Sequence, residues 1–151
     1  MQIKKVVSGG QTGVDRAALD AALAFGIPCG GWCPKGRLAE DGPIPARYPL
    51  NETPSCDYPA RTEWNVRDSD GTLVLSWGRP SGGTALTIAL ARRLKRPCLV
   101  IDLEPADLSC EKIAAWIDLH DVAVLNVAGP RESAGLPIYR KAHALLIKLL
   151  R

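Results

Sequence analysis

The sequence predicts an α/β fold in which a parallel sheet lies between two layers of helices. Short apolar runs of strand length alternate with longer segments of helical periodicity, which is the pattern of repeated strand-helix-strand units. Glycines directly follow several of these runs, as in the tight turns that lead from a strand into a helix. The length of 151 residues suits a single hydrophobic core.

The first strand-helix unit shows the pattern most clearly. Residues 3–8 form a β-rich run that ends at Gly9 and Gly10, and residues 14–25 follow with apolar residues at helical spacing before Gly26. The same criteria place the other strands at about 28–32, 72–76, 98–103 and 122–126. They place the other helices at about 61–69, 84–95, 109–119 and 135–150.

Right-handed connections between parallel strands put helices on both faces of the sheet. We therefore predict a three-layer, doubly wound, Rossmann-like sandwich of about five parallel strands in the order 2-1-3-4-5. The helix at 84–95 is apolar nearly all round until its basic end, so it is either buried on two sides or in contact with another subunit. The second alternative predicts a homo-oligomer, a dimer or a tetramer.

A proline-rich loop at 33–60 interrupts what we expect to be one Rossmann-like domain, residues 1–151. The loop contains six prolines, which cannot sustain a helix or a central strand. It is either a disordered insertion or an ordered functional loop. Its apolar and aromatic residues, among them Ile44, Tyr48 and Leu50, favour a loop that packs on the rest of the chain.

Charge, hydropathy and cysteine content exclude several classes of protein. The net charge of +3 comes from 19 basic and 16 acidic residues mixed along the chain, without the basic run of a nucleic-acid-binding arm. No stretch is long enough for the apolar region of a signal peptide or for a membrane span. Five cysteines, an odd number, are typical of a reducing compartment. We therefore expect a cytoplasmic protein without nucleic-acid or membrane partners.

Glycine-rich turns after the predicted strands indicate a ligand site. Ligands of open parallel sheets bind outside the carboxyl ends of the strands, where SGGQTGVD (8–15) and WGRPSGGTALT (77–87) both open onto a helix. The free N–H groups and positive dipole of a helix N-terminus suit phosphate or a similar oxyanion. A third turn, AGPRESAG (128–135), adds Arg131 and Ser133. Tight turns without a ligand are the simpler alternative.

The helix expected at 61–69 supplies further polar candidates. Its Arg61, Asn65, Asp68 and Ser69 could share one face, which would either hold a sugar, a base or a pterin edge or be solvated. The candidate ligand-binding residues of the turns, the loop and this helix are Gly9, Gly10, Gln11, Thr12, Gly13, Lys35, Arg61, Asn65, Asp68, Ser81, Gly82, Gly83 and Thr84.

Neither a catalytic constellation nor a metal site is predicted. His120 and His143 have no clear route to the strand ends, and no Ser-His-Asp arrangement is evident. Cys29 and Cys33 lack the second pair of ligands of a structural zinc site. Both histidines and both thiols are therefore expected to be structural.

Four motifs follow one another in a specific order: GGQTGVDRAALDAA, GGWCPKGRLAEDGPIP, RTEWNVRDSDGTLVLS and GGTALT. In this the chain resembles the putative molybdenum carrier family. The resemblance implies a Rossmann-like fold related to the lysine-decarboxylase-like and cytokinin-activating phosphoribohydrolase group. It also implies a role in binding or carrying molybdenum cofactor, a pterin with a phosphate and a metal-holding dithiolene. The ligand-binding residues it implies are Gly9, Gly10, Thr12, Gly82, Gly83 and Thr84, with Lys35, Arg61, Asn65 and Asp68.

The chain departs from the related phosphoribohydrolases at the second glycine turn. Those enzymes carry P-G-G-x-G-T followed by acidic residues, whereas PSGGTALT here has Leu86 and Thr87 where the acids would lie. We therefore predict a non-catalytic binding protein for a phosphorylated pterin or nucleotide-like ligand. Molybdenum cofactor is the favoured ligand, and another phosphate-bearing nucleotide is the alternative.

An enzyme is the competing prediction. It would process a nucleotide in the same crevice, in the manner of a phosphoribohydrolase. Its acid or base would be Asp15, Glu40, Asp41 or Asp68. In both cases Gly10→Val and Gly83→Val are expected to abolish ligand binding and to leave the fold largely intact.

Overall fold

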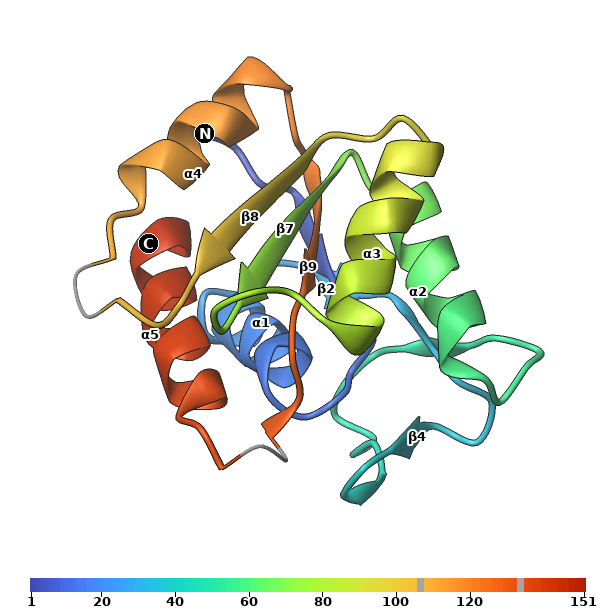
Figure 1. Cartoon of the computed structure of the whole chain (residues 1–151). Helices are drawn as coiled ribbons and strands as arrows, with labels where there is room; N and C mark the ends of the chain where they lie inside the picture. The colour runs from blue at the N-terminus through green and yellow to red at the C-terminus, as the bar shows by residue number, and fades with distance from the viewer. Residues whose placement is uncertain (106–107, 133–134) are drawn as a thin grey trace.

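A five-stranded parallel sheet forms the centre of the molecule in the computed structural model, which describes residues 1–105, 108–132 and 135–151 (Figure 1). The strands of this sheet are β1 (Lys5–Val7), β2 (Cys29–Gly30), β7 (Gly71–Ser76), β8 (Cys98–Asp102) and β9 (Val124–Ala128). The helices are α1 (Val14–Ala24), α2 (Tyr58–Arg67), α3 (Gly82–Arg93), α4 (Glu111–Leu119) and α5 (Ile138–Leu150). The predicted α/β sandwich is confirmed.

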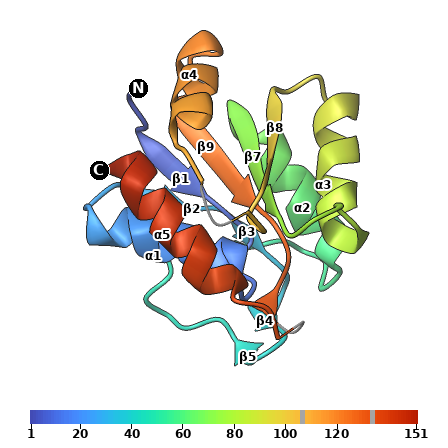
Figure 2. The same ribbon diagram turned by 60° about the vertical axis from the view of Figure 1, so that its left-hand side comes forward.

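Helices cover both faces of the sheet. Helices α1, α4 and α5 lie on one face, and α2 and α3 lie on the other (Figure 2). The periodic apolar residues of α5 are buried against α1, whose inner face consists largely of alanines that allow the two helices to approach closely. These buried residues of α5 are Ile138, Ala142, Leu145, Leu146 and Leu149.

Helix α3 is buried on its inner side only. Thr87 and Leu90 face the sheet and are buried, whereas Ala85 and Ala89 on the outer side are exposed. The helix is therefore not buried on two sides within one chain.

The strand order matches the prediction broadly and differs at the last strand. The expected order was 2-1-3-4-5, and the observed order is β2-β1-β9-β7-β8, which is 2-1-5-3-4 in the same numbering. The pairs of β1 with β2 and of β7 with β8 are as expected. Strand β9 lies in the middle because α5, which follows it, buries its apolar face against α1 next to β1. Leu125 and Val127 of β9 are accordingly fully buried.

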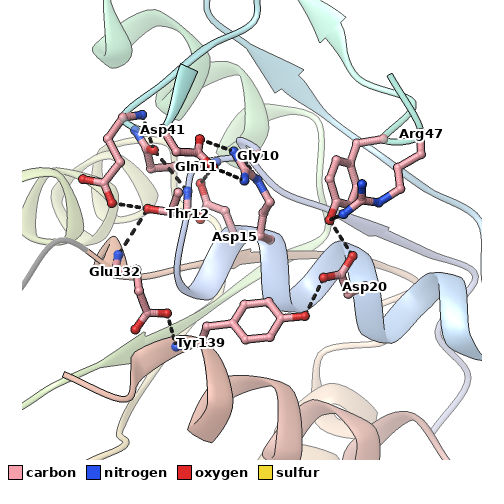
Figure 3. Close-up of polar contacts among 12 residues, drawn as sticks. Gly10, Gln11, Thr12, Asp15, Asp20, Asp41, Arg47, Glu132 and Tyr139 are labelled. Carbon is pink, nitrogen blue, oxygen red and sulfur yellow. Dashed lines mark hydrogen bonds and ion pairs between the residues drawn. The ribbon is translucent and has the colours of Figure 1, made fainter. Parts of the chain in front are cut away.

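The proline-rich segment 33–60 packs against α1. It contains short strands, of which β3 (Trp32–Cys33) pairs with β6 (Asn51–Glu52) and β4 (Leu38–Ala39) pairs with β5 (Gly42–Pro43). A second apolar cluster is buried beneath it and consists of Leu19, Cys33, Ile44, Tyr48 and Leu50. Beside this cluster the Tyr48 hydroxyl donates a hydrogen bond to the Asp20 carboxylate. The Tyr139 hydroxyl of α5 donates to the same carboxylate (Figure 3).

Candidate functional site

A pocket of about 430 Å³ opens at the carboxyl ends of β1, β9 and β7. Its volume lies in the range of roughly 300–1,000 Å³ that is usual for small-molecule sites. The helix after β9 covers one face of the sheet and the helix after β7 covers the other, so the pocket lies where the winding of the sheet changes direction. This is where doubly wound sheets bind their ligands.

The first wall of the pocket is the N-terminus of α3. Ser81 precedes the helix without capping it through its side chain, and no acidic residue lies in the first turn. The first N–H groups of a helix have no acceptor within the helix and carry its positive dipole end. A Cβ atom placed on Gly82 or Gly83 would meet no described atom within 4 Å. This wall therefore consists of a helix start that has free backbone donors and small residues bordering the pocket.

The second wall joins α1 and α2 through a buried ion pair. Arg61 Nη1 lies 3.0 Å from Asp15 Oδ2, and the two side chains are 12% and 7% exposed. Gly9 leaves the space that the Arg61 guanidinium occupies, because a Cβ atom at this position would lie 1.6 Å from Arg61 Nη1. Burial raises the pKa of the Asp15 carboxyl, against the opposing effect of the Arg61 guanidinium.

Gln11 completes the second wall. Its side-chain oxygen accepts hydrogen bonds from the backbone N–H groups of Thr12 at 3.1 Å and Glu40 at 2.9 Å (Figure 3). These two bonds assign the orientation of the amide and leave Nε2 as its free donor. Gln11 Nε2 and Arg61 Nε are both buried without a hydrogen-bond partner in the part of the chain that the structure describes.

The third wall comes from β9 and the turn that follows it. Asn126 is buried within the strand and donates through Nδ2 to the Thr72 hydroxyl at 3.2 Å. Arg131 lies in the turn, and its guanidinium is 5.4 Å from the centre of the Tyr58 ring. The Arg61 guanidinium is 5.2 Å from the same ring. The mouth of the pocket therefore carries two guanidinium groups around one tyrosine.

Eight of the predicted ligand-binding residues line the pocket: Gly9, Gln11, Arg61, Asn65, Ser81, Gly82, Gly83 and Thr84. Among them Asn65 is already engaged, because its amide exchanges two hydrogen bonds with the backbone of Trp32. The turns after β1 and β7 both line the pocket as predicted, but their strands are not the neighbours that the predicted order made them, because β9 lies between them. Ser133, named with the third turn, lies outside the described residues.

Three of the predicted residues belong to the turn after β1 but do not line the pocket. Gly10 has φ 76°, and a Cβ atom on it would overlap the side chains of Leu50 and Ile44. The Thr12 hydroxyl donates to the Glu40 carboxylate and accepts from the N–H of Glu132 (Figure 3). A Cβ atom on Gly13 would lie 2.4 Å from the carbonyl oxygen of Pro130. These residues close the turn rather than line the cavity.

Lys35 and Asp68 also lie away from the pocket. Lys35 is exposed in the proline-rich segment. The Asp68 carboxylate accepts from Trp32 Nε1 at 2.9 Å and pairs with Arg67, whose hydrogen bond lowers the pKa of Asp68. Ser69 is occupied as well, because its hydroxyl donates to the carbonyl of Val66. The predicted polar face of α2 therefore supplies Arg61 and Asn65 only.

Sequence reasoning missed several pocket residues, among them Asn126 and Tyr58. Asn126 had a detectable signal, since an amide in the middle of the apolar run VLNVA is unusual for a buried strand. Tyr58 had no such signal, because only the packed course of the proline-rich segment carries it to the pocket mouth.

The described residues contain neither a metal-binding cluster nor a helix suited to spanning a membrane. No group of three or more His, Cys, Asp or Glu side chains there is arranged to hold a metal ion. Within the same residues, no helix combines the length and the apolar character that crossing a membrane requires. None of the five cysteines lines the pocket.

The chain is similar to one known protein family and to a protein of known structure. The model of the circularly permutated YpsA SLOG family matches residues 6–150. A solved structure, the crystal structure of a putative molybdenum carrier protein from Syntrophus aciditrophicus SB, is 51% identical in sequence and has a TM-score of 0.93. The match covers 99% of this chain and 96% of that chain. No curated protein matches the sequence significantly.

Proposed function

The chain belongs to the circularly permutated YpsA SLOG family, and from this premise we propose that it is a binding or carrier protein for a phosphorylated pterin or nucleotide-like ligand. Molybdenum cofactor is the favoured ligand. The family resemblance drawn from the four motifs is confirmed, since a protein 51% identical to this chain is described as a putative molybdenum carrier protein.

The N-terminus of α3 carries the proposal. Its first turn contains two glycines with free space in front of them and no acidic residue, and it opens into the pocket. Backbone N–H groups at a positive dipole end bind phosphate without needing a lysine or arginine. Arg131 of the neighbouring turn also lies at the mouth, where its guanidinium is 3.9 Å from the Glu40 carboxylate. A phosphate is the ligand group that this combination suits best.

The polar groups of the pocket fit molybdenum cofactor as a phosphorylated pterin. The start of α3 would hold the phosphate, and the pterin would lie against the polar residues that line the rest of the pocket, among them Asp15, Arg61 and Asn126. When bound, the cofactor supplies the dithiolene sulfurs that hold molybdenum. The role of this chain is then to bind and orient the cofactor.

Released-ligand analysis tests this proposal directly. The purified protein is denatured, and the released small molecules are identified by mass spectrometry. We expect a pterin or nucleotide that bears phosphate, and saturable binding of an added pterin monophosphate by calorimetry. A stoichiometric nucleotide together with no affinity for pterin monophosphate would contradict the cofactor assignment. Absence of binding by every phosphorylated pterin and nucleotide would contradict the proposal as a whole.

One observation favours the competing proposal of a nucleotide-processing enzyme. Of the four acidic candidates, Asp15 lines the pocket, and burial raises the pKa of its carboxyl toward the range of a general acid. Glu40 is instead bonded to Thr12. Asp41 is paired with Arg16. Turnover of nucleoside monophosphates that Asp15→Asn abolishes without loss of binding would establish the enzyme; no turnover by the wild-type protein would exclude it.

A further inference from the structure

Strand β8 leaves one edge of the central sheet unpaired. It is the last strand of the sheet and pairs with β7 on its inner side (Figure 1). There the N–H of Leu103 donates to the carbonyl of Ser76, so alternate residues along the strand bond to β7. The backbone N–H and C=O groups of Cys98, Val100 and Asp102 therefore face outward. They have no hydrogen-bond partner among the residues that the structure describes.

This edge lacks the features that usually keep an edge strand from pairing, which are shortness, proline, charged side chains and a covering loop. The opposite edge of the sheet has such features. Strand β2 there has two residues, and the carbonyl oxygen of Pro49 lies 3.3 Å from a Cβ atom placed on Gly30. Strand β8 in contrast has five residues, CLVID, with no proline and with its single charge at the last position. The Val100 side chain in its middle is 38% exposed, so this edge is suited to pair with another strand.

The charges at the two ends of β8 indicate which strand this is. Arg96 precedes the strand and Glu104 follows it, and both are exposed. Neither side chain forms an ion pair with a described residue. A second copy of β8 that runs antiparallel brings the basic start of each strand opposite the acidic end of the other. Centring this pair on Val100 matches residues 98–102 of both copies and sets Arg96 across from Glu104 of the partner subunit.

We infer that β8 is the interface of a homodimer, in which the antiparallel β8 strands of two copies join their sheets into one around a two-fold axis at Val100. Helix α3 packs on β7 and β8, so the two α3 helices come to lie beside each other on one face of the joined sheet. The exposed Ala85 and Ala89 of α3 are small enough to allow this approach. The antiparallel arrangement directs the carboxyl ends of the two sheets in opposite directions, which leaves both pockets open.

Sedimentation velocity of the wild-type protein tests for the dimer, and Val100→Lys tests the interface. In the paired edge the two new lysines would lie opposite each other at the two-fold axis, and like charges there oppose pairing. We expect the wild-type protein to be a dimer and Val100→Lys to be a monomer at the same concentration. Leu23→Lys is the matched control, because Leu23 is 44% exposed and lies on α1, which contacts β1 and β2 near the other edge of the sheet. This control should remain a dimer.

Charge reversal tests the antiparallel register. Arg96→Glu and Glu104→Arg each replace the attractive pairs of the dimer by repulsive ones. We expect each to raise the dissociation constant of the dimer by about ten-fold or more at low salt. The double variant Arg96→Glu/Glu104→Arg restores opposite charges across the edge, so its dissociation constant should return to within a few-fold of the wild-type value. A contact in another register would show no such recovery, because the two side chains would not meet.

Three results would each overturn the inference. The first is a wild-type protein that sediments as a monomer at every concentration. The second is a Val100→Lys variant that thermal melting shows to be folded and that is still a dimer, since the contact would then lie elsewhere. The third is a set of charge reversals in which the single variants leave the dissociation constant unchanged or the double variant shows no recovery.

Discussion

Gly83→Asp separates ligand binding from folding at the start of α3. Gly83 is the second residue of the helix, has no positive φ, and has open space where a Cβ atom would lie. The aspartate therefore enters without a clash. The first turn of α3 has no acidic residue, so the new carboxylate improves the helix by about 0.3–1 kcal/mol through the dipole. In a chain of this size 1 kcal/mol corresponds to a rise in melting temperature of about 2–4 °C.

The same carboxylate should oppose an anionic ligand strongly. Two unit charges about 4 Å apart repel each other by about 4 kcal/mol at an effective dielectric constant of about 20. Since about 1.4 kcal/mol corresponds to a factor of ten, and solvent at the mouth weakens the repulsion, we expect a loss of affinity of about 100-fold or more.

Calorimetric titration with a pterin or nucleoside monophosphate measures this loss, and differential scanning calorimetry measures the stability. Gly83→Asn is the control of equal size without the charge, and it should lose much less affinity than Gly83→Asp. Ligand affinity in Gly83→Asp that stays within a few-fold of the wild-type value would refute a phosphate site at α3. A lower melting temperature in both variants would show instead that Gly83 serves the fold.

Three further changes have defined outcomes. Gly10→Val should lower the stability by about 2 kcal/mol or more, because a Cβ atom at φ 76° would lie 2.5 Å from Leu50 Cδ1; a native melting curve would show the turn to be adaptable. Asp41→Asn should lower the free energy of unfolding by about 0.5–1 kcal/mol at pH 7, because it removes the ion pair with Arg16. Since Arg16 lowers the pKa of Asp41, this stabilisation is lost in the wild-type protein as the pH falls below about 3.8 through that lowered pKa. Denaturant melts at pH 7 and pH 2 should therefore differ from wild type only at pH 7. Ala89→Arg on the exposed side of α3 should convert a homo-oligomer into a monomer, and light scattering measures the change in mass. A wild-type protein that is itself monomeric would exclude the oligomer.

The prediction for Gly10→Val illustrates how a tertiary contact changes an expectation from sequence. From the glycine pattern alone, Gly10 and Gly83 are equivalent, since each lies in a turn between a strand and a helix. In the structure, Gly83 faces open space and Gly10 faces Leu50 of the proline-rich segment. Valine at position 83 therefore remains a test of binding, whereas valine at position 10 tests the packing of that segment.

Tertiary contacts also distinguish the acidic residues that the sequence offered as a catalytic acid or base. Asp15, Glu40 and Asp41 lie near one another in space, but their partners differ. Glu40 and Asp41 hold the proline-rich segment to the start of α1 through Thr12 and Arg16. Asp15 alone of these three lines the pocket. The sequence could not distinguish them because hydrogen-bond partners come from elements 25 or more residues away.

The α/β class, the approximate positions of the helices and the two glycine turns that line the pocket could all be predicted from the sequence. These depend on local patterns: the periodicity of apolar residues sets the elements, and glycine sets the turns. That is why Gln11, Ser81, Gly82 and Gly83 could be named before the structure was known.

The position of the last strand in the sheet, and with it the third wall of the pocket, depends on long-range packing. Strand order depends on which helices bury their apolar faces against each other, and the packing of α5 on α1 draws β9 between β1 and β7. The same long-range packing brings Arg61 to Asp15, 46 residues apart in the chain. Such contacts leave no periodic trace in the sequence, because each partner is compatible with many neighbours until the core selects one.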